Sequence, residues 1–238
     1  MSFLLQTMKE RQAMNEAGDD PVIPPLRIGE KAPDFRARTT QGMVTLGGLR
    51  GRWVILMAHP ASFTPVCTSE FIAMAHHEPA FRRRNCVVLG LSVDSLASHL
   101  AWVDLIKERF DVEIPFPIIE DPSLELSRIY GMLDPSAQDS ATARAVRVID
   151  PEGVLQASLT YPATVGRSIA EMLRLLEALQ EVERSHVVTP EGWHPGQPTL
   201  APPAQTQQSM RQRGRSWFLH PKGNECAGRL SQEDDEEG

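Results

Sequence analysis

The sequence has few of the features that mark secreted, membrane-spanning or zinc-clustered proteins. Three of its 238 residues are cysteine (Cys67, Cys86 and Cys226), too few for a disulfide framework or a four-cysteine zinc site. Its longest unbroken apolar run, Trp53–Ala58, falls far short of the ~20 residues that cross a bilayer. Residues 1–25 lack the apolar core of a signal peptide. We therefore expect a cytoplasmic chain with no membrane partner and one reactive thiol.

Basic charge is scarce as well. The formal net charge is −7, and the acidic run at residues 233–237 contributes five of the negative charges, which leaves the rest of the chain near −2. Nucleic-acid binding depends on a basic surface that neutralises phosphates. The charge pattern therefore predicts no nucleic-acid partner.

Two apolar runs, at residues 53–58 and 87–93, are typical of strands buried on both faces of a parallel sheet. Residues 70–84 lie between them and are numerous enough for a crossover helix, which predicts a right-handed βαβ unit. Ser95 is a candidate N-cap for a second helix over residues 96–110.

The second half of the chain predicts a hairpin followed by a helix. Residues 145–149 and 154–161 have strand patterns, and the turn at residues 150–153 contains proline and glycine. Apolar residues recur at helical spacing over residues 168–183, with Ser168 as the cap. This order predicts an α/β fold: a thioredoxin-like sandwich with a mostly parallel central sheet and an antiparallel hairpin at its edge.

The composition changes near residue 185, beyond which proline and glutamine are frequent and apolar periodicity is weak. We expect an N-terminal arm over residues 1–26, a thioredoxin-like domain over residues 27–184, and an extended C-terminal arm over residues 185–238 with a disordered acidic tail. Four apolar residues of this arm have no core of their own and predict contact with a second subunit: Val187, Val188, Trp193 and Leu200.

The segment at residues 59–70, HPASFTPVCTSE, joins the first apolar strand to the following helix. Open α/β sheets place their sites at such junctions. A cysteine in the first turn of a helix meets unpaired backbone N–H groups and the positive end of the helix dipole, and both favour the thiolate. Thr64 can place its hydroxyl beside the Cys67 sulfur, while Pro60 and Pro65 stiffen the loop. Position alone also fits a Cys67 that is only a small buried apolar residue.

The pattern Pro60-x-x-x-Thr64-x-x-Cys67 resembles the signature of the peroxiredoxins, which are thiol peroxidases with a thioredoxin-like fold. Residues 63–70 are similar to the one-cysteine subgroup and its archaeal relatives. Further similar stretches follow in the same order, at residues 91–95, 99–102, 115–119, 142–144, 161–167 and 189–193. The resemblance covers residues 27–200 and implies a peroxidase that uses neither a metal nor another cofactor.

The resemblance implies a role for each residue of the signature. Cys67 would attack one peroxide oxygen and become a sulfenic acid. Thr64 would hydrogen-bond the thiolate and the peroxide. Pro60 would shield the sulfenic acid from water and further oxidant.

Three charged residues and one histidine complete the set that the resemblance implies. Arg144 would stabilise the thiolate and the departing oxygen. Glu70 would hold an arginine through a bidentate pair, and Arg167 is similar to the second active-site arginine of the subgroup. His59 lies near the pocket in this subgroup, and a purely structural role fits it equally well.

The other cysteines and histidines have less defined roles. Cys226 lies 159 residues beyond Cys67, where the one-cysteine subgroup has no cysteine, although some archaeal relatives use a C-terminal pair. It is therefore a candidate resolving cysteine or an unrelated tail thiol. Cys86 opens an apolar strand and is expected to be inert. The neighbours His76 and His77 have no further ligand at metal-binding spacing, so we expect no metal there.

The resemblance implies hydrogen peroxide and alkyl hydroperoxides as substrates, and an external thiol, thioredoxin-like or small, as reductant. It also implies a homodimer, which in many relatives closes into a decamer. The alternative is a non-catalytic redox sensor or holdase chaperone switched by oxidation of Cys67. The set of Pro60, Thr64, Cys67 and Arg144 favours turnover, because a passive sensor does not need a stabilised leaving oxygen. A cysteine hydrolase is disfavoured, since no matching His and Asp or Asn accompany Cys67.

Overall fold

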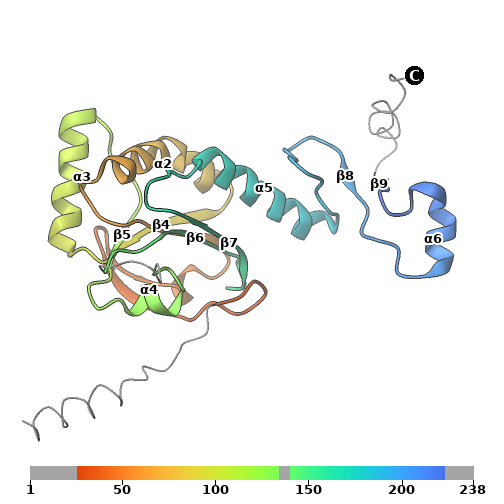
Figure 1. The fold of residues 1–238 in the computed structure, drawn as a ribbon, viewed down its shortest axis with the longest axis horizontal. Coiled ribbons are helices and arrows are strands. Elements are labelled where there is room, and N and C mark those ends of the chain that lie inside the picture. The colour runs from red at the N-terminus through yellow and green to blue at the C-terminus, as the bar shows by residue number, and fades with distance from the viewer. Residues whose placement is uncertain (1–25, 134–139, 223–238) are drawn as a thin grey trace, which may run out of the picture.

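A seven-stranded sheet with the order β2-β1-β5-β4-β3-β6-β7 organises the computed structural model, which describes residues 26–133 and 140–222 (Figure 1). Its strands are β1 (Arg36–Thr39), β2 (Gly42–Thr45), β3 (Trp53–Ala58), β4 (Cys86–Ser92), β5 (Ile118–Glu120), β6 (Arg144–Ile149) and β7 (Leu155–Tyr161). The central strands β3, β4 and β5 pair in parallel, and only β1 and β6 run opposite to the other five. The predicted mostly parallel sheet with the β6–β7 hairpin at its edge is confirmed.

Helices cover both faces of this sheet (Figure 1). They are α2 (Pro65–Arg83), α3 (Leu96–Phe110), α4 (Glu125–Ile129) and α5 (Ile169–Ser185), followed in the C-terminal arm by α6 (Gln207–Arg213). Short 3₁₀ turns lie at Gly47–Leu49 and Gly214–Ser216. Within residues 26–133 and 140–222, no helix combines the length and the hydropathy of a bilayer-spanning segment.

The apolar run of β3 supplies both cores. Trp53, Ile55 and Met57 pack with α2, α3 and α5 on one face of the sheet. Val54 and Leu56 lie on the other face, among residues of α4 and of the N-terminal strands. Successive side chains of a strand alternate between faces, so a strand covered on both sides reads as a continuous apolar run.

The predicted helices are present. The helix over residues 96–110 has the predicted bounds, and the hydroxyls of Ser95 and Ser168 each accept a hydrogen bond from the backbone N–H three residues on. The helix before β4 was predicted over residues 70–84 but begins five residues earlier, at Pro65. Proline is well suited to the first helical position. It continues through Pro79.

Beyond α5 the C-terminal arm points away from the sheet and carries α6 and the small sheet of β8 (Thr199–Leu200) and β9 (Pro221–Lys222) (Figure 1). The expectation that four apolar residues of the arm need a second subunit is wrong for Val187 and Trp193, which this chain itself buries to 4% and 3% exposure. The Trp193 carbonyl accepts a hydrogen bond from Arg174 of α5 at 3.0 Å. Residues 1–25, the acidic tail and Cys226 lie outside the described residues.

Candidate active site

Cys67 is the third residue of α2, where β3 passes through a short loop into the helix, and its side chain is fully buried. Thr64 is the N-cap but makes no side-chain capping bond, and Pro65 follows it without an N–H group. The Thr68 N–H bonds to the Thr64 carbonyl at 2.9 Å. The N–H groups of Val66 and Cys67 therefore have no partner inside the helix and are available to negative charge.

Arg144, the first residue of β6, points its guanidinium group at this cysteine. Its Nη1 lies 3.3 Å from Cys67 Sγ and donates to Glu70 Oε2 at 2.8 Å. Its Nε donates to the Ala163 carbonyl at 2.8 Å, which fixes the orientation of the side chain. Because Arg144 is only 2% exposed, its charge acts on the sulfur with little screening by water.

Glu70 lies one helical turn after Cys67 and binds both arginines. Arg167 donates to it in a bidentate manner, from Nε to Oε1 at 2.9 Å and from Nη2 to Oε2 at 2.8 Å, and its backbone N–H also reaches Oε1 at 2.6 Å. Burial alone would raise the Glu70 pKa, but the hydrogen bonds and charges of Arg167 and Arg144 outweigh it and hold that pKa below 4.5. The carboxylate is therefore ionised at neutral pH.

The charges of this buried cluster balance in only one state of the sulfur. Two guanidinium groups face one carboxylate, and all three side chains are at most 3% exposed. A neutral thiol leaves one positive charge uncompensated in a low-dielectric region, whereas a thiolate brings the sum to zero.

The Thr64 hydroxyl has a different partner from the one predicted. It donates to the Ala61 carbonyl at 2.9 Å, and Arg144 provides the one hydrogen bond to Cys67 Sγ found among the described residues. Pro60 lies half-buried at the start of this loop. Phe63, directly before Thr64, is 52% exposed and has φ of 60°, a left-handed conformation that strains a bulky residue.

His59, which directly follows β3, is fully buried. Its ring packs edge-on against Phe71, with centroids 4.6 Å apart, and stacks on Trp102 at 5.2 Å. Burial, with the charges of His99 and the two arginines, lowers the His59 pKa well below its ordinary value of 6.5. The ring is neutral at pH 7, and neither of its nitrogens has a hydrogen-bond partner.

An apolar groove of about 620 Å³ runs between α2 and α3 beside this site. Its lining includes Phe63, Thr64, Pro65, Ile72, Trp102 and Phe110. The groove reaches the helical turn that carries Cys67, but the sulfur itself is enclosed.

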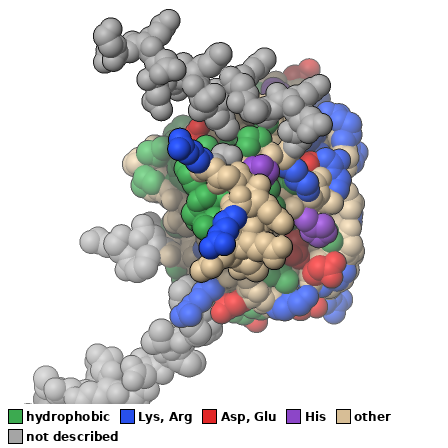
Figure 2. Space-filling view, turned by 90° about the vertical axis from the view of Figure 1, so that its right-hand side faces the viewer, with side chains coloured by type: hydrophobic (Ala, Val, Ile, Leu, Met, Phe, Trp, Pro, Cys, Tyr) green, Lys and Arg blue, Asp and Glu red, His purple; other side chains and the backbone are tan. Residues whose placement is uncertain are grey.

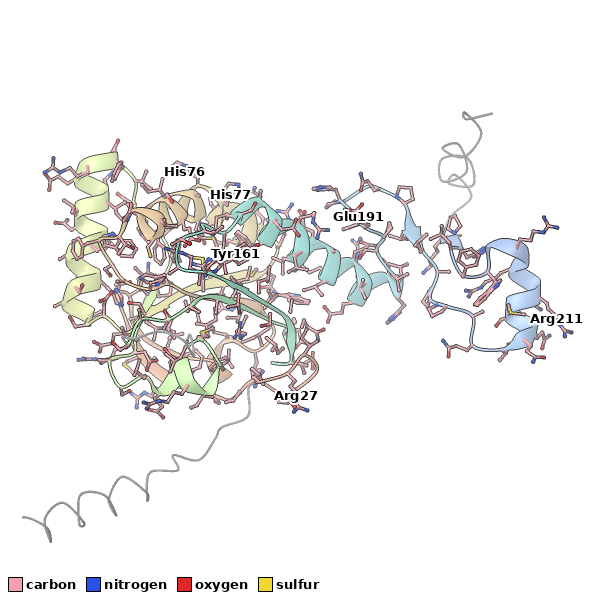
Figure 3. All side chains as sticks on the ribbon, in the orientation of Figure 1. Arg27, His76, His77, Tyr161, Glu191 and Arg211 are labelled. Atoms are coloured by element: carbon pink, nitrogen blue, oxygen red, sulfur yellow. The ribbon has the colours of Figure 1, made fainter. Side chains whose placement is uncertain are left out.

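Cys86, His76 and His77 lie outside this cluster. Cys86 is buried in β4, and burial raises its pKa to about 12, which makes it a poor nucleophile. His76 is exposed and His77 half-buried on the outer side of α2 (Figure 3). The sequence did not indicate the Ala163 carbonyl that orients Arg144, because a backbone acceptor has no residue-type signature.

Comparison with known proteins identifies the family. The AhpC/TSA family model matches residues 28–158, and the model for the C-terminal domain of 1-Cys peroxiredoxin matches residues 178–215. Peroxiredoxin 2 of Caldanaerobacter subterraneus subsp. tengcongensis is 46% identical over 187 residues, covering 79% of this chain and 85% of that protein. The peroxiredoxin of Aquifex aeolicus is 51% identical over 170 residues, covering 71% and 77%.

Solved structures of peroxiredoxins are also similar to this chain. A Cys-to-Ser mutant of the peroxiredoxin 6 of Arenicola marina aligns with a TM-score of 0.72 at 34% identity, over 79% of this chain and 88% of that one. A yeast mitochondrial 1-Cys peroxiredoxin aligns with a TM-score of 0.72 at 38% identity, over 84% and 95%. No finding favours the sensor or chaperone alternative. A buried cysteine in the first turn of a helix, an arginine on its sulfur and these matches together assign the chain to the peroxiredoxins, thiol-dependent peroxidases with a thioredoxin-like fold.

Proposed function

We propose that this peroxiredoxin reduces hydrogen peroxide and alkyl hydroperoxides with Cys67 as the attacking thiolate. The observation that carries the proposal is the contact of Arg144 Nη1 with Cys67 Sγ at 3.3 Å, inside a buried cluster that is neutral only when the sulfur is charged. Glu70 and Arg167 act as positioning residues, because they hold Arg144 in place without touching the sulfur.

The chemical step is a displacement at oxygen. The Cys67 thiolate attacks the terminal peroxide oxygen, the S–O bond forms as the O–O bond breaks, and two electrons pass from sulfur to the peroxide. The products are a sulfenic acid and an alkoxide or hydroxide ion, which takes a proton from water. Arg144 and the free N–H groups of the helix terminus stabilise the charge that builds up on the leaving oxygen.

Two loop residues complete the proposed site. Pro60 restricts access of water to the sulfenic acid. The Thr64 hydroxyl, which now donates to the Ala61 carbonyl, exchanges that acceptor for a peroxide oxygen when substrate enters. Entry requires movement of this loop, since Cys67 is fully buried, and the strained conformation of Phe63 lowers the free energy needed to move it.

A thiol reductant returns the sulfenic acid to the thiol. We propose that a first thiol displaces water from the sulfenic acid and forms a mixed disulfide with Cys67, and that a second thiol then attacks the first, which releases the Cys67 thiol and leaves a disulfide between the two reductant thiols. An external thiol, thioredoxin-like or small, fits this role, and Cys226 is a candidate for the first thiol. The yeast relative supports the external route, because its solved structure concerns a thiol resolving mechanism that uses glutathione and thioredoxin systems.

We also propose that residues 27–184 form the peroxidase domain and that the C-terminal arm over residues 185–238 pairs with a second copy of the chain. The arm carries three consecutive apolar residues, Trp217, Phe218 and Leu219, that are 38%, 71% and 41% exposed. In the view that faces the arm, hydrophobic side chains gather on one side of the molecule (Figure 2). A homodimer, or a decamer built from it, would cover them.

A cytoplasmic location agrees with this chemistry. Cys67 and Cys86 are both free thiols, and a reducing compartment preserves the catalytic thiol between turnovers.

Peroxide consumption with dithiothreitol as reductant tests the assignment. We expect Cys67→Ser to reduce turnover to the uncatalysed rate, because the nucleophile that contacts Arg144 is lost. Cys86→Ser is the matched control and should keep most of the wild-type rate, since that thiol is buried in β4 and held protonated. Full turnover in the Cys67 variant would refute the mechanism.

A further inference from the structure

His59 belongs to a second group of polar side chains, which takes no part in the hydrogen bonds around Cys67. His59 follows β3, Asp94 lies in the loop after β4, and His99 lies in the first turn of α3. One ligand atom from each of the three lies within 4.8 Å of the others. In the part of the chain that the structure describes, no other group of three His, Cys, Asp or Glu residues meets this condition.

Both imidazole rings have nitrogen atoms without partners. His59 Nδ1 and Nε2 and His99 Nε2 make no hydrogen bond, although both side chains are 0% exposed. Nearly all buried polar atoms in proteins are hydrogen-bonded, and an unpaired one destabilises the fold unless a water or an ion satisfies it. Backbone groups of Leu91 and Ile119 face the two rings without completing a hydrogen bond of normal geometry. A water or an ion beside the rings would satisfy these nitrogens.

The groups around the cluster are arranged to orient its ligands. Ser62 Oγ lies 3.0 Å from His99 Nδ1, and when that nitrogen donates to the hydroxyl, Nε2 carries the free lone pair. The Ser62 N–H donates to Asp94 Oδ2 at 2.6 Å, and the Ser92 hydroxyl donates to the same oxygen at 3.0 Å. Metal-binding histidines and carboxylates are commonly held by such second contacts.

We propose that His59, Asp94 and His99 bind one divalent transition-metal ion of the zinc type. Two imidazoles and a carboxylate, with an open fourth position, form a ligand set that zinc accepts. Asp94 is half-buried beside the exposed Ser95, which gives the ion a short path from solvent.

The ligands must draw together when the ion enters. Zinc–ligand bonds of about 2.0–2.1 Å place tetrahedral ligand atoms about 3.3 Å apart, which is closer than the present limit of 4.8 Å. Asp94 can supply this movement, because it lies in a loop rather than in the sheet. Arg144 and Arg167 repel a cation near His59, but Glu70 pairs with both, and Asp94 adds a negative charge at the site itself.

The proposal does not depend on the peroxidase assignment, and the test is designed to keep the two apart. All measurements use full-length protein carrying Cys67→Ser, freed of metal by a chelator, so that the thiol neither binds the ion nor reacts. Zinc binding is followed by calorimetry. Cobalt binding is followed by visible absorption and by quenching of Trp102, whose ring stacks on His59.

We expect one zinc ion per chain, with an affinity about tenfold or more weaker in Asp94→Asn and in His99→Gln. His76→Ala is the matched control, because it removes an exposed histidine from the outer side of α2 (Figure 3), and it should bind zinc like the parent. Cobalt should quench the parent more than its Trp102→Phe derivative.

The proposal is overturned if zinc fails to bind the folded parent, or if Asp94→Asn binds it as tightly as the parent does. Equal weakening by His76→Ala would overturn it as well. Should His99→Gln fail to fold by circular dichroism, the isosteric Asp94→Asn variant decides alone.

Discussion

At the scale of single residues, Glu70 determines how the two buried arginines are placed. One carboxylate accepts hydrogen bonds from both guanidinium groups, and the helical turn from Cys67 to Glu70 sets its distance from the sulfur. Without its charge, two like charges would face each other in the interior. The position of Arg144 on Cys67 thus depends on a residue that does not contact the sulfur.

Glu70→Gln should therefore lower both stability and activity. Removing one partner of a buried ion pair typically costs about 3–5 kcal/mol, which urea denaturation of the variant and wild type measures. We also expect slower alkylation of Cys67 by iodoacetamide at pH 7, because Arg144 is no longer held on the sulfur. An unchanged midpoint together with an unchanged alkylation rate would contradict this role.

The same carboxylate predicts an acid dependence. The folded-state pKa of Glu70 is below the ordinary 4.5, so the unfolded state binds a proton more readily as the pH falls. Its contribution to stability is complete above about pH 4.5 and is lost as the pH falls toward the lowered folded-state value. The unfolding free energy of Glu70→Gln should accordingly change less than that of wild type between pH 5 and pH 3, as measured by denaturation at fixed pH.

Arg144→Lys tests whether the planar guanidinium group matters beyond its charge. Lysine keeps the positive charge but cannot bind the sulfur, Glu70 and the Ala163 carbonyl from one rigid fork. We expect the single-turnover rate of peroxide reduction to fall about 10²–10³-fold. A rate within a factor of two of wild type would show that charge alone suffices.

The sequence indicated most of the residues that the structure places around Cys67, because they belong to motifs whose spacing is specific to one family. It did not indicate Asp94 or His99 as neighbours of His59, since these three residues come from two separate loops and a helix that only the folded sheet brings together. The hydrogen-bond partner of the Thr64 hydroxyl was equally inaccessible, because it depends on the loop conformation.

At the scale of elements, the site depends on the close packing of α2 against the sheet. Gly90 of β4 lies beneath Phe71, the residue of α2 that packs against the His59 ring. A Cβ atom at Gly90 would lie 3.1 Å from Phe71 and 3.3 Å from Ile118, closer than ordinary packing contacts. Glycine therefore lets the helix approach the strand.

Gly90→Ala should destabilise the fold by about 1–3 kcal/mol through overpacking. Gly166→Ala is a suitable control, because its Cβ would meet Val66 at 3.4 Å, an ordinary van der Waals contact. Thermal or urea denaturation of both variants separates the two cases. Equal stability of the two variants would mean that Phe71 can shift without cost.

Long elements were predictable and short ones were not. The strands and helices with continuous apolar or helical patterns, such as β3, α3 and α5, matched their predicted positions closely. By contrast, β1, β2, β5 and α4 have only three to five residues each, which is too few for a recognisable period. The N-cap of α4, Leu124, has a φ of 61° and no capping side chain. The Asp121 carboxylate, three residues earlier, accepts hydrogen bonds from the N–H groups of Leu126 and Ser127 instead, so the start signal lies outside the usual N-cap position.

At the scale of the whole molecule, the described part of the C-terminal arm leaves large apolar side chains exposed. Phe218 is 71% exposed and adjoins Trp217, whose ring meets it edge-on. Light scattering should give at least a dimer at micromolar concentration, and Phe218→Ser should weaken that dimer. Met43→Ser is the matched control, as it removes a 53% exposed apolar side chain from β2 of the body. A wild-type monomer would contradict the proposed assembly.

The charge balance around Cys67 also bears on the half of the cycle that follows peroxide reduction. A sulfenic acid is neutral, so oxidation leaves the two guanidinium groups with a single carboxylate between them and a surplus positive charge in dry surroundings. That surplus attracts the next anion to arrive, and the thiolate of a reductant is such an anion. Reduction of the peroxide thus changes the buried cluster from neutral to positively charged. The oxidised site then attracts the anionic reductant that restores the Cys67 thiol.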